Sequence, residues 1–131
     1  MTDADPIAQL RTALRRGDGR TAATLLPQLR VAVVAGPDGS ARTAVVGSIR
    51  VLPVFLSMDS WRAFADAGTP VLLDPDRFRR ILDETTAEQV RFDPATAEAV
   101  DVPVADVRLL VRGEYLDGAQ LRIAGEIVLR P

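Results

Sequence analysis

The sequence predicts a single small α+β domain, with a mixed or antiparallel sheet of about five strands and helices mainly on one face. Two observations predict this fold. The chain has 131 residues, of which 47% are apolar, which matches the common size and core content of one globular domain. Segments with the apolar spacing of helices also interleave with short β-branched segments, and no repeat, linker or low-complexity tract separates them.

The first 28 residues are predicted to be helical. A first helix is expected to begin at Pro6, after a cap by Asp5, and to end at Gly17. Its apolar residues follow helical spacing: Ile7, Leu10 and Leu14. A second, short helix is expected over 20–26, before Pro27. This opening segment is therefore a helical pair.

The next segment is predicted to form strands. Residues 30–35 and 42–51 are rich in small and branched side chains and flank a Gly-Pro-Asp-Gly turn at 36–39, which predicts an antiparallel hairpin. The segment 51–56 is apolar at both alternating positions, which favours a central strand. Pro53 has no N–H to donate, so it is expected at a bulge, an edge or a break.

Three helices and three short strands are predicted between residues 57 and 113. The strands are expected at 70–73, 89–92 and 100–102. The helices are expected to start after Ser57, after Asp74 and at Pro103. Each helix is expected to bury one apolar face, and these faces are, in order, Trp61, Phe64 and Ala65; Phe78, Ile81 and Leu82; and Val104, Val107, Leu110 and Val111. Gly68 and Gly113 are expected to end the first and third helices.

The last segment, 114–131, is predicted to add a C-terminal strand to the core formed by 29–113. Over 119–131, apolar and charged residues alternate with period 2, which is typical of a half-buried strand. The apolar positions are Leu121, Ile123, Ile127 and Leu129, and the charged ones are Arg122, Glu126 and Arg130. With 1–28 as a helical N-terminal segment, the whole chain forms one domain.

Two sequence runs resemble a known family. The run Leu52-Pro53-Val54-Phe55-Leu56-Ser57 leads into a helix with an aromatic residue near its end. The run Arg91-Phe92-Asp93-Pro94 is followed by Val102-Pro103-Val104 and a helix that ends at a glycine. With the helical start and the hairpin, these runs resemble the N-terminal domain of the SseB-like (enhanced serine sensitivity) proteins, over residues 20–113.

In that family the first run reads approximately Leu-Pro-Val-Phe-Thr-Ser, and the second contains an Asn-Pro turn. This chain has Leu56 in place of the Thr and Asp93 in place of the Asn. The resemblance implies a small α/β fold and an adaptor or regulatory role. It supplies no catalytic residues.

The composition excludes most familiar catalytic sites. The chain contains no Cys, His or Lys, so its 16 basic residues are all Arg, against 18 acidic residues. Without Cys and His there is no disulfide framework, zinc ribbon, thiol nucleophile or imidazole base. The serines have neither His nor Lys to activate them, and none lies in a Gly-x-Ser-x-Gly motif. We therefore expect no catalytic residues, no cofactor and no metal, and function through binding.

An enzyme or a small-molecule site remains the alternative. The carboxylates that such a site could use are grouped at Asp74, Asp76, Asp83 and Glu84, a set that could hold a hard cation. Roles as helix cap, dipole partner and ion-pair partner are favoured for these residues. An anionic ligand could instead be held by arginines near strand ends: Arg50, Arg62 and Arg91.

The preferred hypothesis is binding to a protein partner or to a second copy of the chain. Candidate contact residues are the aromatic pair Trp61 and Phe64, the basic residues Arg11 and Arg15, and the apolar positions Leu121, Ile123 and Ile127 of an edge strand that could support a homodimer. Core packing for the aromatic pair and a solvated helix face for the arginines are the alternatives.

Nucleic acid and membrane are not expected as partners. The net charge is −2 and aromatic residues make up 5% of the chain, whereas nucleic-acid binders are usually basic. No apolar run approaches the roughly 20 residues that span a bilayer. We expect a cytoplasmic protein, because the start MTDADPIAQL is acidic where a secretion signal is basic.

Overall fold

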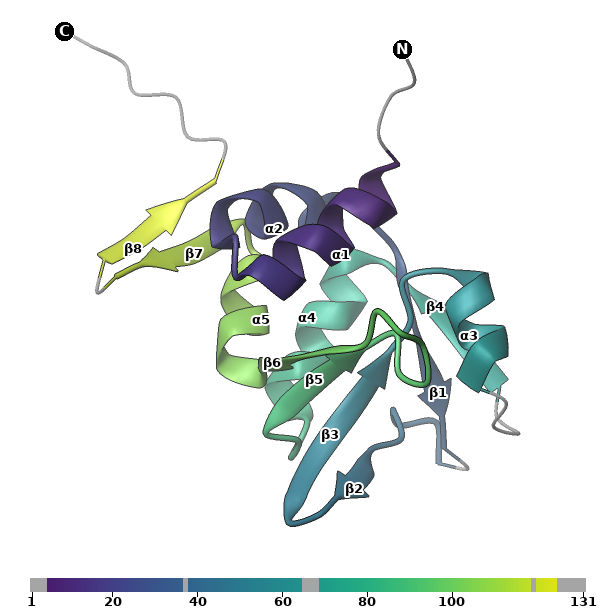
Figure 1. The fold of residues 1–131 in the computed structure, drawn as a ribbon. Coiled ribbons are helices and arrows are strands. Elements are labelled where there is room, and N and C mark those ends of the chain that lie inside the picture. Colours follow the sequence, from purple (N-terminus) through teal and green to yellow (C-terminus); the bar gives the residue numbers. More distant parts are fainter. Residues whose placement is uncertain (1–4, 37, 65–68, 119, 125–131) are drawn as a thin grey trace, which may run out of the picture.

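A mixed four-stranded sheet forms the centre of the molecule (Figure 1). The computed structural model describes residues 5–36, 38–64, 69–118 and 120–124. The sheet has the order β2-β3-β5-β6, with the strands β2 (Ala44–Val46), β3 (Ile49–Val54), β5 (Gln89–Phe92) and β6 (Val100–Pro103). The pair β3–β5 is parallel and the other two pairs are antiparallel.

A second, two-stranded ladder lies beside this sheet. β1 (Val31–Ala35) pairs antiparallel with β4 (Thr69–Leu73). One antiparallel bridge joins the ladder to the end of β3, because Ala32 and Phe55 exchange two N–H to C=O hydrogen bonds of 2.9 Å each. The bridge places β1 next to the central sheet.

The hairpin predicted between 30–35 and 42–51 is wrong in its pairing. After β1 the chain turns back only far enough for one bridge between Ala35 and Ala41. The run 42–51 instead folds on itself as β2 and the start of β3, with Gly47 in the turn at a φ of 63°. Glycine adopts a positive φ without a steric cost, so this turn divides the run that looked continuous in sequence.

Pro53 lies at a position where no hydrogen-bond donor is needed. The C=O groups of Arg50 and Val54 accept bonds from Glu88 and Asp93, so even-numbered residues of β3 point their backbone groups toward β5. Odd-numbered residues therefore point the other way. On that side β2 ends opposite Val51, and the bridge to β1 begins at Phe55. Pro53 thus lies at a local edge, one of the three expected positions, and β3 itself continues through it.

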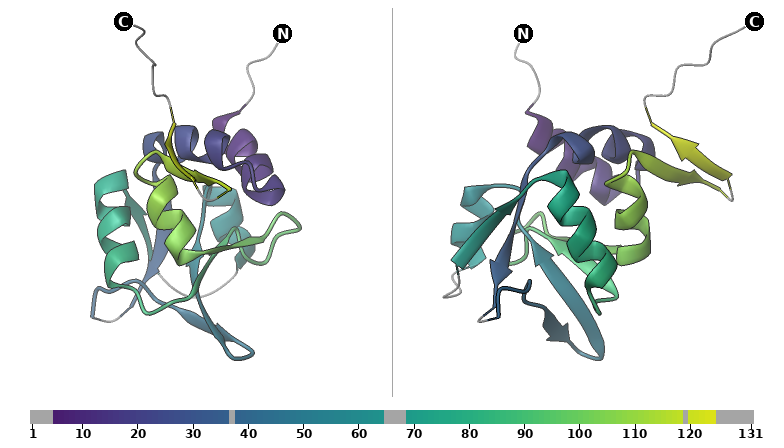
Figure 2. Two further views of the ribbon diagram at one scale, coloured as in Figure 1. Left: turned by 90° about the vertical axis from the view of Figure 1, so that its left-hand side faces the viewer. Right: turned by 180° about the vertical axis from the view of Figure 1, so that it is seen from behind.

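Four of the five α-helices in the described part of the chain cover one face of the strands. They are α1 (Pro6–Arg16), α2 (Gly19–Leu25), which continues into a short 3₁₀ turn η1 (Leu26–Gln28), α4 (Pro75–Glu84) and α5 (Val104–Leu110). α3 (Met58–Phe64) packs on the opposite face of β1, as the two views in Figure 2 show. The prediction of helices mainly on one face is confirmed.

β1 separates two apolar clusters because its side chains alternate. Val31 and Val33 belong to the main core, which contains residues from α1, α2, α4 and α5. Ala32 and Val34 form a smaller cluster with Phe55, beneath α3. The period of 2 in a strand thus lets one strand serve both layers.

Three of the predicted helix starts are confirmed by capping bonds. Asp5 Oδ1 accepts from the Ile7 N–H at 3.0 Å, and Asp74 Oδ1 accepts from the Arg77 N–H at 2.8 Å. Ser57 Oγ accepts from the Ser60 N–H at 3.2 Å. Each bond satisfies a donor that the first helical turn leaves without a partner. The predicted positions Ala65 and Gly68 lie outside the described residues.

The C-terminal segment contains two strands where one was predicted. β7 (Glu114–Asp117) and β8 (Gln120–Ile123) form an antiparallel hairpin, with Gly118 at a φ of 61° after the first strand. All four residues of β8 are exposed, so the expected half-buried strand is also wrong over these residues. The predicted positions Ile127 and Leu129 lie outside the described residues.

Together these elements make a small single α+β domain, as predicted. The hairpin β7–β8 projects from the end of the domain where α1 and α2 lie (Figure 1). Among the described residues, no helix has the length and apolar character required to cross a membrane.

Candidate functional site

A charged pair joins three elements at the carboxyl end of β5. Asp93 is only 1% exposed, and its Oδ2 accepts a hydrogen bond from Arg11 Nε on α1 at 2.6 Å. Its Oδ1 accepts from the Leu56 N–H, just after β3, at 2.8 Å. Both carboxylate oxygens therefore have partners, as a buried charge requires.

The backbone around Asp93 is held as firmly as its side chain. Its φ is 51°, a left-handed conformation that Asp and Asn adopt more readily than most residues. Its N–H donates to the Val54 C=O at 2.8 Å, and its C=O accepts from Thr96 Oγ1 at 2.8 Å. The turn after β5 thus fixes the carboxylate between α1 and the end of β3.

Two serines extend the hydrogen bonds around Asp93 and Arg11 to α3. Arg11 Nη2 donates to Ser57 Oγ at 3.0 Å, and Ser60, which is buried, donates through Oγ to the Ser57 C=O at 2.8 Å. We call Arg11, Ser57, Ser60 and Asp93 the polar junction. Its hydroxyl groups cap α3 and connect α3 to α1. The hydroxyl groups of Ser57 and Ser60 and the carboxylate of Asp93 are all engaged in hydrogen bonds.

A shallow hollow of about 330 Å³ opens beside the polar junction. Its charged lining residues are three acids, Asp5, Asp59 and Glu98, and one base, Arg11. The guanidinium of Arg11 is shared between Asp93 and Glu98, the latter at 3.4 Å. This balance of charge disfavours an anionic ligand, since the hollow presents more carboxylate than free cation.

The three arginines predicted to hold an anion bind different partners. Arg50 donates to Thr43 Oγ1 at 3.0 Å, and Arg62 lies 3.4 Å from an Asp59 oxygen. Arg91 donates from Nε and Nη2 to the two oxygens of Asp101, at 2.7 and 2.9 Å. The structure does not bring these guanidiniums together.

The Arg91–Asp101 pair changes the acidity of its carboxyl. The hydrogen bonds from Arg91, more than its charge alone, hold the pKa of Asp101 below the ordinary value for aspartate. The side chains cross from β5 to β6 at directly paired positions. The pair therefore supports the edge of the sheet.

The predicted carboxylate cluster divides among structural roles. Asp74 caps α4, and Asp76 lies 3.8 Å from Arg79. Asp83 lies 3.9 Å from Arg108 and 4.0 Å from Arg112, which connects α4 to the α5 region. Within the described residues, no three side chains of His, Cys, Asp or Glu are grouped as metal ligands would be.

The β7–β8 hairpin presents its apolar face to solvent. Leu116 lies directly opposite Leu121, and Ile123 lies on the same face. Their exposed fractions are 52%, 55% and 56%. We call these three residues the hairpin face. Tyr115, on the other side of β7, packs against the core and against Gly19 of α2.

A cavity of about 170 Å³ adjoins the hairpin face. It lies between the hairpin and the helices α1, α2 and α5, and Leu116 lines it. Its lining is mainly apolar, with Asp18 and Asp106 as its charged members. Hydrogen bonds from the Thr21 side chain and N–H lower the pKa of Asp18, so this carboxylate is charged at neutral pH.

The structure places the remaining predicted contact residues in different settings. Trp61 and Phe64 are half-buried and pack edge-on against Phe55, with ring centroids 5.0 and 5.3 Å away. Arg15 is exposed, as a solvated helix face requires. The interpretation as a solvated helix face is wrong for Arg11, which is bound within the polar junction. Ile127 lies outside the described residues.

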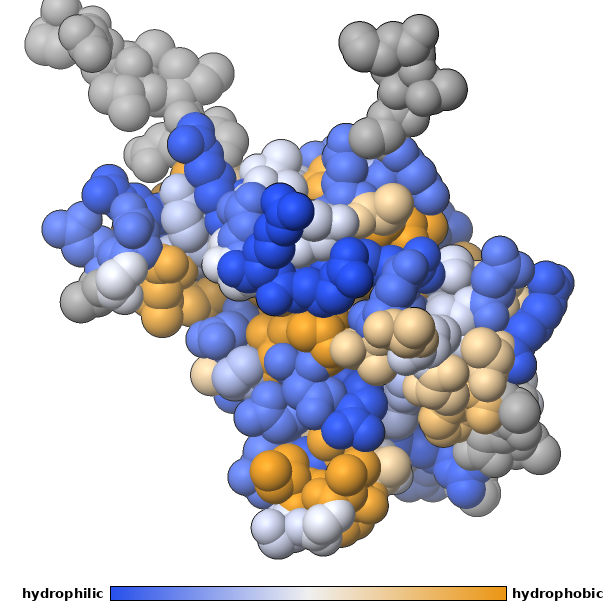
Figure 3. Space-filling model, in the orientation of Figure 1, coloured by the Kyte–Doolittle hydropathy of each residue, from blue (hydrophilic) through white to orange (hydrophobic). Residues whose placement is uncertain are grey.

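A second exposed apolar patch was not predicted. It lies at the turn between β2 and β3, at the lower end of the molecule in Figure 3, and consists of Val45, Val46 and Ile49. In the sequence, their branched side chains are typical of an ordinary strand. The turn at Gly47 carries them beyond the covering helices.

Comparison with models of protein families and with curated proteins finds no match for this chain. The resemblance to SseB-like domains stays a prediction. Sequence reasoning also missed the pairing of Arg11 with Asp93. The signal available was an Asp-Pro turn directly after a strand, but the parallel pairing that brings it to α1 could not be read from spacing.

Proposed function

We propose that this chain is a non-catalytic, cytoplasmic protein-interaction module with a regulatory or adaptor role, in line with its resemblance to SseB-like domains. The observation that carries the proposal is the outward orientation of the hairpin face, Leu116, Leu121 and Ile123. A hairpin at the edge of a domain normally turns its apolar side toward the core and its polar side toward water.

Exposed apolar side chains that form a contiguous group are typical of interaction sites. The three residues of the hairpin face lie on adjacent strands, and Leu116 connects them to the cavity beneath. A partner that covers the face would remove three large apolar side chains from water. This burial supplies the main favourable free energy of protein association.

The arrangement of the polar groups supports binding rather than catalysis. Among the described residues, the one buried carboxylate is that of Asp93, which is held by Arg11 and by the Leu56 N–H, and the buried Ser60 is bound to Ser57. The arginines of the alternative hypothesis, a small-molecule site for an anion, bind separate partners. These contacts favour the interaction hypothesis over that alternative.

The test is partner capture from an extract of the native host. The immobilised wild-type chain, Leu121→Asp and Val45→Asp are compared, and bound proteins are identified by mass spectrometry. Both substitutions place a charge at an exposed apolar position, at 55% and 60% exposure, so Val45→Asp is a matched control. Circular dichroism verifies that all three chains are folded.

We expect a partner that is retained by the wild type and by Val45→Asp and lost by Leu121→Asp. A second copy of the chain counts as a partner and is detected by sedimentation. If Leu121→Asp retains every protein that the wild type binds, and the wild type is a monomer, the proposal is wrong.

A further inference from the structure

We propose that β8 pairs antiparallel with β8 of a second copy of this chain, about a two-fold axis that passes through Leu121. The inference rests on the proposed function and names its partner. It joins two β7–β8 hairpins into one continuous four-stranded sheet, in the manner of strand addition at a sheet edge.

The backbone of β8 presents its unpaired groups at the positions of the hairpin face. The Ala124 N–H donates to the Gly113 C=O at 2.6 Å, so the backbone groups of residue 124 point toward β7. By alternation, those of Arg122 also point toward β7, and those of Leu121 and Ile123 point away. Among the described residues, no strand pairs with this outer edge of β8.

The side chains at the same two positions are apolar and exposed. A two-fold axis perpendicular to the sheet keeps each side chain on its own face. Pairing of β8 with its copy would therefore place the two hairpin faces next to one another on the same side of the sheet. The same contact would pair the edge amides and bring the apolar side chains of the two copies side by side.

Charge selects the register and favours a second copy arranged in this way. Opposite residues of an antiparallel pair share a face, so the axis passes through a residue, and within β8 the central choices are Leu121 and Arg122. An axis at Arg122 would bring two guanidiniums together. An axis at Leu121 places Arg122 opposite the partner's Gln120.

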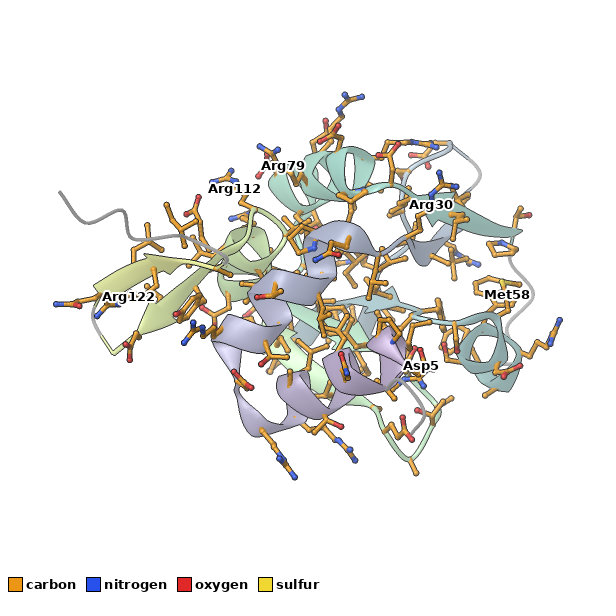
Figure 4. All side chains as sticks on the ribbon, turned by 90° about the horizontal axis from the view of Figure 1, so that it is seen from above. Asp5, Arg30, Met58, Arg79, Arg112 and Arg122 are labelled. Atoms are coloured by element: carbon orange, nitrogen blue, oxygen red, sulfur yellow. The ribbon has the colours of Figure 1, made fainter. Side chains whose placement is uncertain are left out.

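The register at Leu121 extends contacts that already exist within the hairpin. Arg122 donates to Gln120 Oε1 of its own chain at 2.8 Å and lies 3.6 Å from an Asp117 oxygen. Figure 4 shows Arg122 on the hairpin, at the end of the molecule opposite Met58 of α3. Nearby oxygen acceptors in both copies would thus surround each guanidinium.

Self-pairing at β8 also closes the assembly. The helices α2 and α5 pack against β7, and the proposed contact uses the edge of β8. A two-fold contact uses this edge in both copies. The expected species is a dimer and not a growing filament.

The absence of Cys allows a direct test of the register. Three single-cysteine variants, Leu121→Cys, Arg122→Cys and Val45→Cys, are oxidised, and covalent dimer is measured on a non-reducing gel. Val45 is the control, because it is an exposed apolar residue on a different edge strand, β2.

We expect Leu121→Cys to form several-fold more covalent dimer than either other variant. A maximum at Arg122→Cys overturns the proposed register. Equal yields in all three variants indicate random collision and overturn the pairing.

Proline variants test the role of the edge amides without relying on oxidation. Leu121→Pro removes an N–H that points away from β7, so the hairpin retains its own hydrogen bonds. Val45→Pro is matched, because Val45 lies between the hydrogen-bonded pairs of the β2–β3 hairpin and its N–H also points outward.

Sedimentation is expected to show a dimer for the wild type and for Val45→Pro, and a monomer for Leu121→Pro. A wild-type chain that remains monomeric up to millimolar concentration overturns the self-pairing. The proposed function would then be decided separately, by whether Leu121→Asp loses a captured protein.

Discussion

Substitution of Asp93 tests the polar junction that fixes α1, β3 and β5 relative to one another. Asp93→Ala leaves the buried Leu56 N–H without an acceptor, which costs about 1–3 kcal/mol. It also removes the partner of Arg11, and loss of one member of a buried ion pair costs about 3–5 kcal/mol in total. The Arg11 side chain is 20% exposed and can regain some hydration. We therefore expect the free energy of unfolding to fall by about 3–4 kcal/mol.

Asp93→Asn is the more discriminating change. Asn retains an acceptor for the Leu56 N–H and tolerates the positive φ. Its amide cannot provide a charged acceptor for Arg11, and a hydrogen bond to a charged group contributes about 1.5–3 kcal/mol. We expect a loss of about 2 kcal/mol.

The assay is urea unfolding at neutral pH, followed by circular dichroism and by the fluorescence of Trp61, the single tryptophan. Glu98→Gln is the control, because Glu98 also lies near Arg11 but is 48% exposed, and its loss should cost under about 0.5 kcal/mol. In an Arg11→Met background the cost of Asp93→Asn should fall by at least half. An unchanged cost, or a loss below about 0.5 kcal/mol for Asp93→Asn alone, would refute the reasoning.

Three further substitutions test packing and charge. Phe55→Ala should lower the free energy of unfolding in urea by about 3–5 kcal/mol, since Phe55 is fully buried, and a loss below about 1 kcal/mol would contradict its core position. Asp101→Asn removes a carboxyl whose pKa is lowered by Arg91. At neutral pH, the free energy of unfolding of the wild type should exceed that of this variant by at most about 0.5 kcal/mol. The difference should vanish as the pH falls through the lowered pKa of Asp101. A difference that grows in acid would show that the expected sign is wrong. Gly19→Ala places a Cβ 3.1 Å from Tyr115 Cβ, and we expect a net loss of about 1 kcal/mol in thermal unfolding, so a stabilised variant would show that the hairpin adapts freely.

Local signals in the sequence predicted the helices well. Asp5, Ser57 and Asp74 precede their helices as caps, and each accepts the expected backbone hydrogen bond. Val104 and Val107 follow the apolar spacing of α5 and are buried. These signals succeed because capping and amphipathic spacing act over one or two turns of chain.

Strand pairing was harder to predict because it depends on residues far apart in sequence. β1 pairs with β4 across β2, β3 and α3, and β3 pairs with β5 across α3, β4 and α4. The polar junction depends on this pairing, since Arg11 and Asp93 are separated by 82 positions. The spacing of residues along the sequence does not show which strands become neighbours.

The candidate contact surface was predicted in part. Period-2 alternation identified Leu121 and Ile123 as one face of a strand, and the structure places both on an edge strand. The sequence did not reveal that this face is turned outward, because alternation defines two faces and not which one is covered. Leu116 was missed because it joins the face only through the pairing of β7 with β8.

Amide hydrogen exchange, measured by NMR in dilute and in concentrated solution, tests the central claim most directly. The N–H of Leu121 points away from β7 and, in the proposed register, would be donated to the C=O of the partner's Leu121. We predict that it exchanges more slowly in the concentrated sample, while the outward N–H of Val45 exchanges at the same rate in both. Equal exchange of the Leu121 N–H at the two concentrations would contradict the account.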